Sequence, residues 1–291
     1  MSSSNGAKGS TGPAVAAEGI GKRYELGETA SIQRTLRALR PSKARAWKQE
    51  HSLQALRDIS FSIDWGEAYT FVGANGSGKS TLAGILSGLI EPTTGQVTVP
   101  ERTIPVLGLS PGLHPEMKGT ENVYQYSIAL GYTPDDIEEV MDKVLDFSEL
   151  SKAHMNTPIK RFSSGMRTRL TVSVVLNLPS DLLIFDEVLA KADTAFKGRC
   201  IERITDLVAE GRTIIYIGHE MELIRNLCTR GLWLEEGELK QVGDVEDIVL
   251  AYAASAVGAD EIARREGKNR ERAEAYAALA QQAAEATSSK P

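Results

Sequence analysis

The sequence predicts an α/β protein, in which helices cover a core made of a parallel β-sheet. Two observations favour this class. Apolar runs at residues 182–185 and 213–217 have the length and composition of strands that are buried on both faces. A glycine-rich stretch at residues 73–80 follows a third such run and precedes a helical pattern. With 291 residues and an ordinary composition, the chain is long enough to bury a sizeable core.

The glycine-rich stretch has the spacing of a phosphate-binding P-loop, Gly-x-x-x-x-Gly-Lys-Ser. Glycines let the backbone turn tightly so that its N–H groups point into one concavity, and the following helix adds the positive end of its dipole. Lys79 would reach the β- and γ-phosphates of a nucleoside triphosphate, Ser80 would hold Mg²⁺, and Thr81 would touch the α-phosphate. By itself the loop indicates a site for a nucleoside triphosphate and little more. The nucleotide-binding residues predicted here are Gly73, Ala74, Asn75, Gly76, Ser77, Gly78, Lys79, Ser80 and Thr81.

The neighbours of this loop argue against a chance glycine-rich turn, which is the alternative. Residues 68–72 before it are β-prone and mostly apolar, as a central parallel strand should be. After it, apolar residues recur at helical spacing as far as Leu89, and Glu91-Pro92 is expected to end that helix. Residues 96–99 then predict another strand.

Two strands are expected before the loop, at residues 15–24 and 53–63. Tyr24 ends the first, and its ring could stack on an adenine base. A half-buried strand tyrosine is the alternative, which the nearby P-loop makes less favourable. Residues 1–13 are rich in Ser and Gly and are expected to be a disordered tail.

A basic insertion at residues 25–54 separates these two strands. Between residues 31 and 48 every charged residue is Arg or Lys, and apolar residues recur at helical spacing. Such a basic, weakly amphipathic helix could touch the anionic surface of the cytoplasmic membrane or dock on a partner. A solvated surface insertion is the alternative.

The second half of the chain predicts a helical subdomain and then a return to α/β structure. Residues 105–178 are expected to be largely helical, with a helix start at Thr133 and Pro134 and a core-facing apolar stripe at residues 137–145. A helix is expected at residues 200–210 and a hairpin with its turn at residues 235–238. A helical, Ala-rich tail is expected at residues 251–291. The main domain would then span residues 14–250.

Charged and polar side chains follow two of the predicted parallel strands. Asp186 and Glu187 come directly after one strand, and His219 comes after the next. Because chemistry in parallel sheets gathers at the carboxyl ends of the strands, we expect these side chains to face the P-loop. Asp186 fits a ligand of Mg²⁺ through water, Glu187 fits the general base, and His219 could contact the γ-phosphate. A chance acidic pair and a structural histidine are the alternatives.

Composition argues against several other classes. The formal net charge of −6 disfavours a general nucleic-acid binder, so no specific nucleic acid is expected as a partner. No run of about 18 apolar residues is present, so no membrane-spanning helix is predicted, and the N-terminus lacks a hydrophobic signal region. Cys200 and Cys228 have no metal-binding spacing and are expected to be reduced structural thiols.

A last motif connects these features to a known family. Residues 162–166 read Phe-Ser-Ser-Gly-Met and open a helix shortly before the strand that ends in Asp186. Here the chain resembles the nucleotide-binding subunits of ABC transporters, whose signature motif reads Leu-Ser-Gly-Gly-Gln. The P-loop, the signature, the acidic strand, a D-loop-like segment containing Asp193 and the histidine at His219 occur in the family's order. The resemblance implies the ABC ATPase fold. This fold has a P-loop NTPase (RecA-like) parallel sheet core, an antiparallel β portion and an inserted helical subdomain.

The residues of these motifs most resemble those of the ATP-binding subunits of exporters of capsule polysaccharide, O-antigen and teichoic acid. The segments that carry this likeness are residues 112–122, 163–170 and 186–196. The insertion after Tyr24 also resembles that group, in which a helix near this position is thought to face the membrane and gate substrate entry.

This resemblance implies a head-to-tail homodimer that sandwiches ATP between the P-loop of one subunit and the signature of the other. Hydrolysis would require Lys79, Glu187 and His219. The metal, Mg²⁺, would lie at Ser80 and Asp186. A transmembrane permease on a separate chain would be the partner, at the cytoplasmic face of the cell membrane. The signature residues that would face the opposite ATP are Ser163, Ser164, Gly165 and Met166.

The sequence also departs from the family pattern. Residues 106–111 contain no Q-loop glutamine, and Gln125 lies too far along to be assigned that place. We expect no carbohydrate-binding β-sandwich after the ATPase domain, which favours selection of the substrate by the permease. A soluble ABC ATPase that acts on ribosomes or DNA, and the ATPase subunit of another ABC transporter, are the alternatives.

Overall fold

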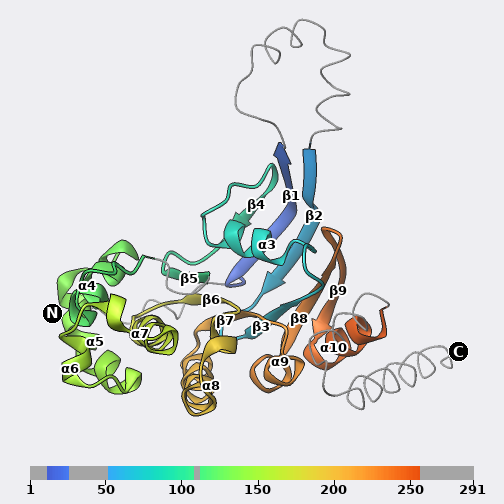
Figure 1. The fold of residues 1–291 in the computed structure, drawn as a ribbon. Coiled ribbons are helices and arrows are strands. Elements are labelled where there is room, and N and C mark those ends of the chain that lie inside the picture. The colour runs from blue at the N-terminus through green and yellow to red at the C-terminus, as the bar shows by residue number, and fades with distance from the viewer. Residues whose placement is uncertain (1–11, 26–51, 108–111, 256–291) are drawn as a thin grey trace, which may run out of the picture.

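The computed structural model describes residues 12–25, 52–107 and 112–255, and their strands form two sheets (Figure 1). The smaller sheet has the order β2-β1-β4 and is antiparallel. The larger has the order β5-β6-β7-β3-β8-β9. The strands are β1 (Val15–Glu25), β2 (Ser52–Ile63), β3 (Ala68–Val72), β4 (Thr94–Thr98), β5 (Thr103–Leu107), β6 (Leu182–Asp186), β7 (Thr213–Ile217), β8 (Arg230–Glu235) and β9 (Glu238–Asp244).

The larger sheet is the predicted parallel core. Strands β5, β6, β7, β3 and β8 pair in parallel, and β9 returns antiparallel to β8 as the expected hairpin. The apolar runs at its centre are buried on both faces, because successive side chains point to opposite sides of a strand. On β6, Ile184 points to one face and Phe185 to the other, and both are fully buried.

Two hydrophobic cores lie on the two faces of this sheet. One lies between the larger sheet, the antiparallel sheet and helix α3 (Lys79–Leu86). The other packs helices α8 (Thr194–Ala209), α9 (Met221–Leu227) and α10 (Val245–Ala254) on the opposite face (Figure 1). This layering confirms the predicted α/β class.

A group of helices lies at one side of the molecule, coloured green to yellow in Figure 1. Thr133 and Asp136 form the capping box of α5, and Pro134 is its first residue, as expected. Ile137, Val140 and Val144 on the apolar stripe are buried. The helices are α4 (Gly119–Ala129), α5 (Pro134–Ser148), α6 (Lys152–Met155) and α7 (Ser164–Asn177), with short 3-10 turns η1 (Ile159–Arg161) and η2 (Val188–Lys191) nearby.

The helical subdomain begins later than the expected residue 105. Residues 103–107 form strand β5, in which Ile104 and Val106 alternate into the core around Pro105. Proline cannot donate a ladder hydrogen bond, but β5 lies at the edge of the sheet, where that loss is tolerated.

Three further boundaries differ from the expectation. Helix α3 ends at Leu86 instead of continuing to Glu91, because the chain turns through Gly88 with φ +69°, and Leu89 is 67% exposed. Helix α8 starts before residue 200, because Asp193 caps it. Helix α10 runs to Ala254, past the expected domain end at residue 250.

Several expectations lie outside the described residues. They are the N-terminal tail as far as residue 11, the basic helix at residues 31–48, most of the residues expected to hold a Q-loop glutamine, and the tail from residue 256. Within the described part of the chain, no helix is long and apolar enough to cross a membrane. Cys200 and Cys228 are buried free thiols, and burial raises the pKa of Cys200 to about 12.

Candidate functional site

The glycine-rich loop leaves β3 and enters α3, as the sequence predicts. Gly73 has φ +150°, and a Cβ atom there would lie 2.2 Å from the carbonyl oxygen of Leu234 on β8. Gly78, with φ +109°, precedes the first residue of α3, and a Cβ atom there would lie 2.8 Å from the carbonyl oxygen of Ala55 on β2. The loop is thus pressed between two strands, and only glycine allows this approach.

Lys79 lies at the centre of the loop. Its side chain is buried, and its Nζ donates to the carbonyl oxygens of Gly73 at 2.6 Å and Ala74 at 2.8 Å. The loop therefore holds the ammonium group next to the concavity formed by its own backbone.

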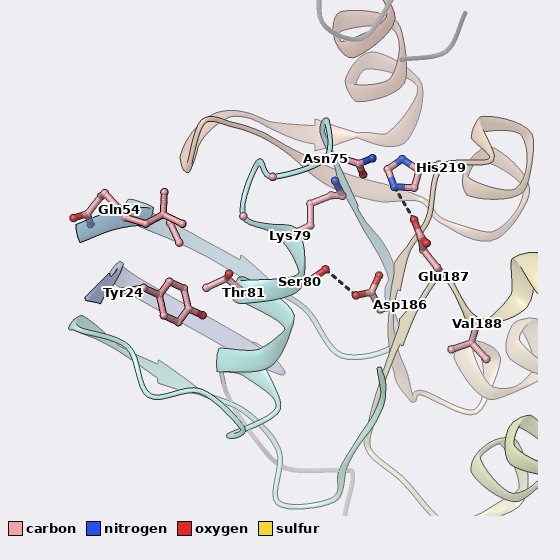
Figure 2. A pocket seen from close by; sticks show the side chains of 14 residues that line it. Tyr24, Gln54, Asn75, Lys79, Ser80, Thr81, Asp186, Glu187, Val188 and His219 are labelled. Atoms are coloured by element: carbon pink, nitrogen blue, oxygen red, sulfur yellow. Dashed lines mark hydrogen bonds and ion pairs between the residues drawn. The ribbon is translucent and has the colours of Figure 1, made fainter. Parts of the chain in front are cut away.

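Ser80 and Asp186 meet beside this lysine, although they are 106 residues apart in the chain. The hydroxyl of Ser80 donates to Asp186 Oδ2 at 2.9 Å (Figure 2). Burial raises the pKa of Asp186, while the Ser80 hydrogen bond opposes that shift. A hydroxyl and a carboxylate are oxygen ligands of the kind that Mg²⁺ takes, so this pair fits the ion that the sequence predicts.

Glu187 follows the end of β6 and His219 follows the end of β7, and their side chains meet. His219 Nε2 lies 2.8 Å from Glu187 Oε1 (Figure 2). Glu187 has φ +55°, a left-handed conformation that is uncommon outside glycine, and its N–H donates to the carbonyl oxygen of Ile217 at 2.9 Å. This backbone bond to β7 holds the residue in that conformation, which directs its side chain toward the histidine.

These side chains share one cavity of about 500 Å³. In Figure 2, Tyr24 lies at one end, Glu187 and His219 lie at the other, and the loop and α3 run between them. The predicted residues that line it are Tyr24, Asn75, Gly76, Gly78, Lys79, Ser80, Thr81, Asp186, Glu187 and His219.

Three predicted loop residues do not line this cavity. Ala74 and Ser77 line a smaller cavity behind the loop, of about 200 Å³, beside Trp233 and Tyr252. Gly73 lies against β8.

Sequence reasoning missed the contribution of β2. Leu53, Gln54 and Ala55 line the cavity beside Tyr24, because β2 pairs with β1 so that Leu53 lies opposite Tyr24. Gln54 accepts a hydrogen bond from Arg23 Nε at 2.8 Å. No sequence signal reveals this pairing, since 28 residues separate Tyr24 from Leu53 and the register is set across that insertion. Val188, which follows the acidic pair, was also missed.

The signature residues do not line this cavity. Ser163 caps α7, where its hydroxyl accepts from the N–H of Met166 at 3.1 Å, and Ser164 begins the helix. Asp193 caps α8 and also receives two hydrogen bonds from Arg169 of α7. Gln125 lies on α4, away from the cavity, and its side-chain oxygen is buried without a hydrogen-bond partner in the described structure.

Comparison with known proteins gives a consistent set of relatives. Residues 56–190 match the family model described as ABC transporter. The O-antigen export system ATP-binding protein RfbB of Klebsiella pneumoniae is 40% identical over 198 residues, which cover 68% of this chain and 80% of that protein. The teichoic acids export ATP-binding protein TagH of Listeria innocua is 32% identical over 238 residues, 82% of this chain and 69% of that protein. TagH of Bacillus cereus is 32% identical over 209 residues, 71% of this chain but 38% of that longer protein.

Solved structures show the same fold. A solved structure of an ATP-binding subunit of an ABC transporter has a TM-score of 0.65 at 21% identity, over 86% of this chain and 98% of that chain. The ATP-binding cassette MJ0796, in a dimeric post-hydrolysis state bound to ADP and Pi, has a TM-score of 0.64 at 19% identity, over 79% and 98% of the two chains.

Proposed function

Because this chain belongs to the ABC transporter family of ATP-binding proteins, we propose that it is the ATP-hydrolysing subunit of a cell-surface glycan exporter. The cargo would be a lipid-linked polysaccharide or a teichoic acid, as the names of the relatives RfbB and TagH suggest. ATP hydrolysis is supported by the family and by the cassette fold.

The observation that carries the proposal is the shared cavity. It brings a lysine in a phosphate-binding loop, a hydroxyl–carboxylate pair and a carboxylate–histidine pair within one space. Phosphoryl transfer needs little covalent chemistry from the protein and depends on positioning and charge stabilisation, which these groups can supply.

Each group has a role in this mechanism. Lys79 would turn from the loop carbonyls to the β- and γ-phosphates. Glu187 would accept the proton of the attacking water, and His219, which pairs with Glu187, would contact the γ-phosphate. Ser80 and Asp186 would hold Mg²⁺, which when bound neutralises charge on the phosphate oxygens. Tyr24 would stack on the base at the far end of the cavity.

A second subunit would complete the site. The signature residues at the start of α7 and Asp193 lie outside this chain's own cavity, so we propose that they contact the ATP of a partner copy in a head-to-tail homodimer. The helix N-terminus at Ser164 would then offer backbone N–H groups to the γ-phosphate. A separate transmembrane permease, at the cytoplasmic face of the membrane, would be moved by closure and opening of this dimer.

Depletion of the protein in its source cell tests the export proposal. We expect lipid-linked glycan to accumulate inside the cell and surface glycan to fall, because the polymer is made but not moved. Wild-type protein should restore export, and Glu187→Gln should not. Normal surface glycan after depletion would contradict the proposal.

The ATPase role of Glu187 is tested with purified protein. Glu187→Gln should lower ATP turnover by about 10² to 10⁴, the usual contribution of a general base, and should leave ATP binding in place. The variant should also accumulate as an ATP-bound dimer, measured by size-exclusion chromatography. Glu202→Gln, on the exposed side of α8, is the matched control. Turnover at the wild-type rate in Glu187→Gln would remove Glu187 from this role.

A further inference from the structure

The end of β1 that carries Tyr24 extends past its neighbour β4. The last β1 residue paired with β4 is Gly21, opposite Thr94. Beyond that point β1 keeps β2 on one side, with Tyr24 opposite Leu53. On the other side it is hydrogen-bonded to the turn after α3. The N–H of Thr93 donates to Gly21 O at 2.7 Å, and the N–H of Arg23 donates to Thr93 Oγ1 at 3.0 Å.

Lys22 makes a third hydrogen bond between this end of β1 and the turn after α3. Its Nζ donates to the carbonyl oxygen of Glu91 at 2.7 Å. The same Nζ stands 5.1 Å from the centroid of the Tyr24 ring. Lys22 and Tyr24 are two positions apart on one strand, so their side chains leave the same face of the sheet. A cation at this distance from an aromatic ring is attracted by the negative face of the ring.

Lys22 itself does not line the nucleotide cavity, whereas Tyr24 does. The ammonium group therefore contacts the ring and is not one of the groups that line the cavity. Because Glu91 O fixes the ammonium and the ammonium attracts the ring, one orientation of Tyr24 is favoured before any nucleotide arrives.

We propose that Lys22 is a positioning residue for nucleotide binding, which holds the Tyr24 ring ready to receive the base. This inference rests on the proposed function, in which Tyr24 stacks on adenine. A ring that is already oriented loses less conformational freedom on binding, so base-containing ligands should bind more tightly. The effect should depend on the base and on Tyr24, and the phosphate end of the cavity should be unaffected.

The test compares two probes on the purified full chain, ATP and inorganic tripolyphosphate, which has the phosphates but no base. Lys22→Met keeps the aliphatic stem and removes the cation. We expect it to raise the Kd for ATP about two- to fivefold, the range that an exposed cation–π contact corresponds to, and to leave the Kd for tripolyphosphate unchanged. Lys22→Arg, which keeps a cation and a donor, should bind ATP nearly as wild type. Lys160→Met, whose lysine pairs with Glu116 in the helical subdomain, is the control.

A double-mutant cycle separates the action through Tyr24 from a general loosening of the turn. In a Tyr24→Ala background, Lys22→Met should have no further effect on ATP binding. An additive effect in that background, or an equal loss for ATP and tripolyphosphate, would overturn the proposal. Failure of the proposed stacking of Tyr24 on adenine would look different, since Tyr24→Ala alone would then leave the Kd for ATP unchanged.

Discussion

At the scale of single residues, one backbone position controls how the phosphate-binding loop packs on the sheet. A Cβ atom added at Gly73 would lie 2.2 Å from the carbonyl oxygen of Leu234 and 2.7 Å from Ser77 Oγ. Real Cβ contacts are never this short with a backbone atom, so any side chain at this position displaces the loop or β8. The two carbonyl groups that hold Lys79 belong to Gly73 and Ala74, so the lysine would move with them.

We predict that Gly73→Ala raises the Kd for ATP at least about tenfold and also lowers stability by a few kcal/mol, as a strained, overpacked site does. Gly198→Ala is the control, because the added Cβ meets nothing within 4 Å on helix α8 and should stabilise by about 0.5 to 1 kcal/mol. Titration calorimetry gives the affinity and urea unfolding gives the stability. Wild-type affinity in Gly73→Ala would mean that the loop tolerates the displacement.

At the scale of elements, helix α5 shows how a local capping motif decides where a helix begins. The carboxylate Asp136 Oδ2 accepts from Thr133 N at 2.9 Å and from Thr133 Oγ1 at 2.7 Å, while Asp136 N donates to Thr133 Oγ1 at 3.3 Å. The hydrogen bonds from Thr133 lower the pKa of Asp136 below its usual value of 3.8. A lowered folded-state pKa contributes stability that is present above pH 3.8 and is lost as the pH falls through the folded value.

We predict that Thr133→Ala lowers the free energy of unfolding by about 1 kcal/mol at neutral pH, the usual cost of losing an N-cap. The difference between variant and wild type should shrink when the pH falls below 3.8, because the wild type then also loses the charged Asp136. Urea unfolding at several pH values measures both effects. Thr205→Ala removes a hydroxyl from the middle of α8 and should show no such pH dependence. A difference that stays constant with pH would show that the carboxylate plays no part.

At the scale of the whole molecule, an ionic network joins the helical subdomain to the core. Arg169 of α7 donates to Asp193 Oδ2 at 3.1 and 2.7 Å and also contacts Glu149 at the end of α5. Arg199 of α8 contacts Glu149 as well. Beneath these charges the rings of Phe147 and Phe196 pack edge to face at 5.6 Å. The hydrogen bond from Arg169 holds the pKa of Glu149 below its usual range.

Arg169→Met should therefore loosen the subdomain from α8 without unfolding either part, because it removes the ion pairs and the guanidinium contact with the Phe196 ring but keeps an apolar stem of similar length. We expect amide hydrogen exchange to rise severalfold at the start of α8 and the end of α5. In the control Arg203→Met, which removes an ion pair with Glu210 within the core, exchange at the end of α5 should stay unchanged. Exchange that is equal in Arg169→Met and wild type would show that the apolar packing alone joins the two parts.

Local features could be read from the amino-acid order. The phosphate-binding loop, the acidic strand end at Asp186 and the cap at Thr133 are each formed by residues that are close to one another in the sequence. Hydrogen bonds between near neighbours and the spacing of apolar residues determine such features, and both are visible in a sequence. The family resemblance rests on the same local motifs, and the comparisons bear it out.

Contacts between distant segments were decided only by the tertiary structure. Leu53 and Gln54 reach the cavity through the register of β2 on β1, Pro105 is tolerated because β5 is an edge strand, and Lys22 meets Glu91 across 69 residues. The left-handed backbone of Glu187 depends on a hydrogen bond to the neighbouring strand. Sheet order, register and edge position are set by the packing of the whole chain, since no short stretch of residues records which strand will lie beside it.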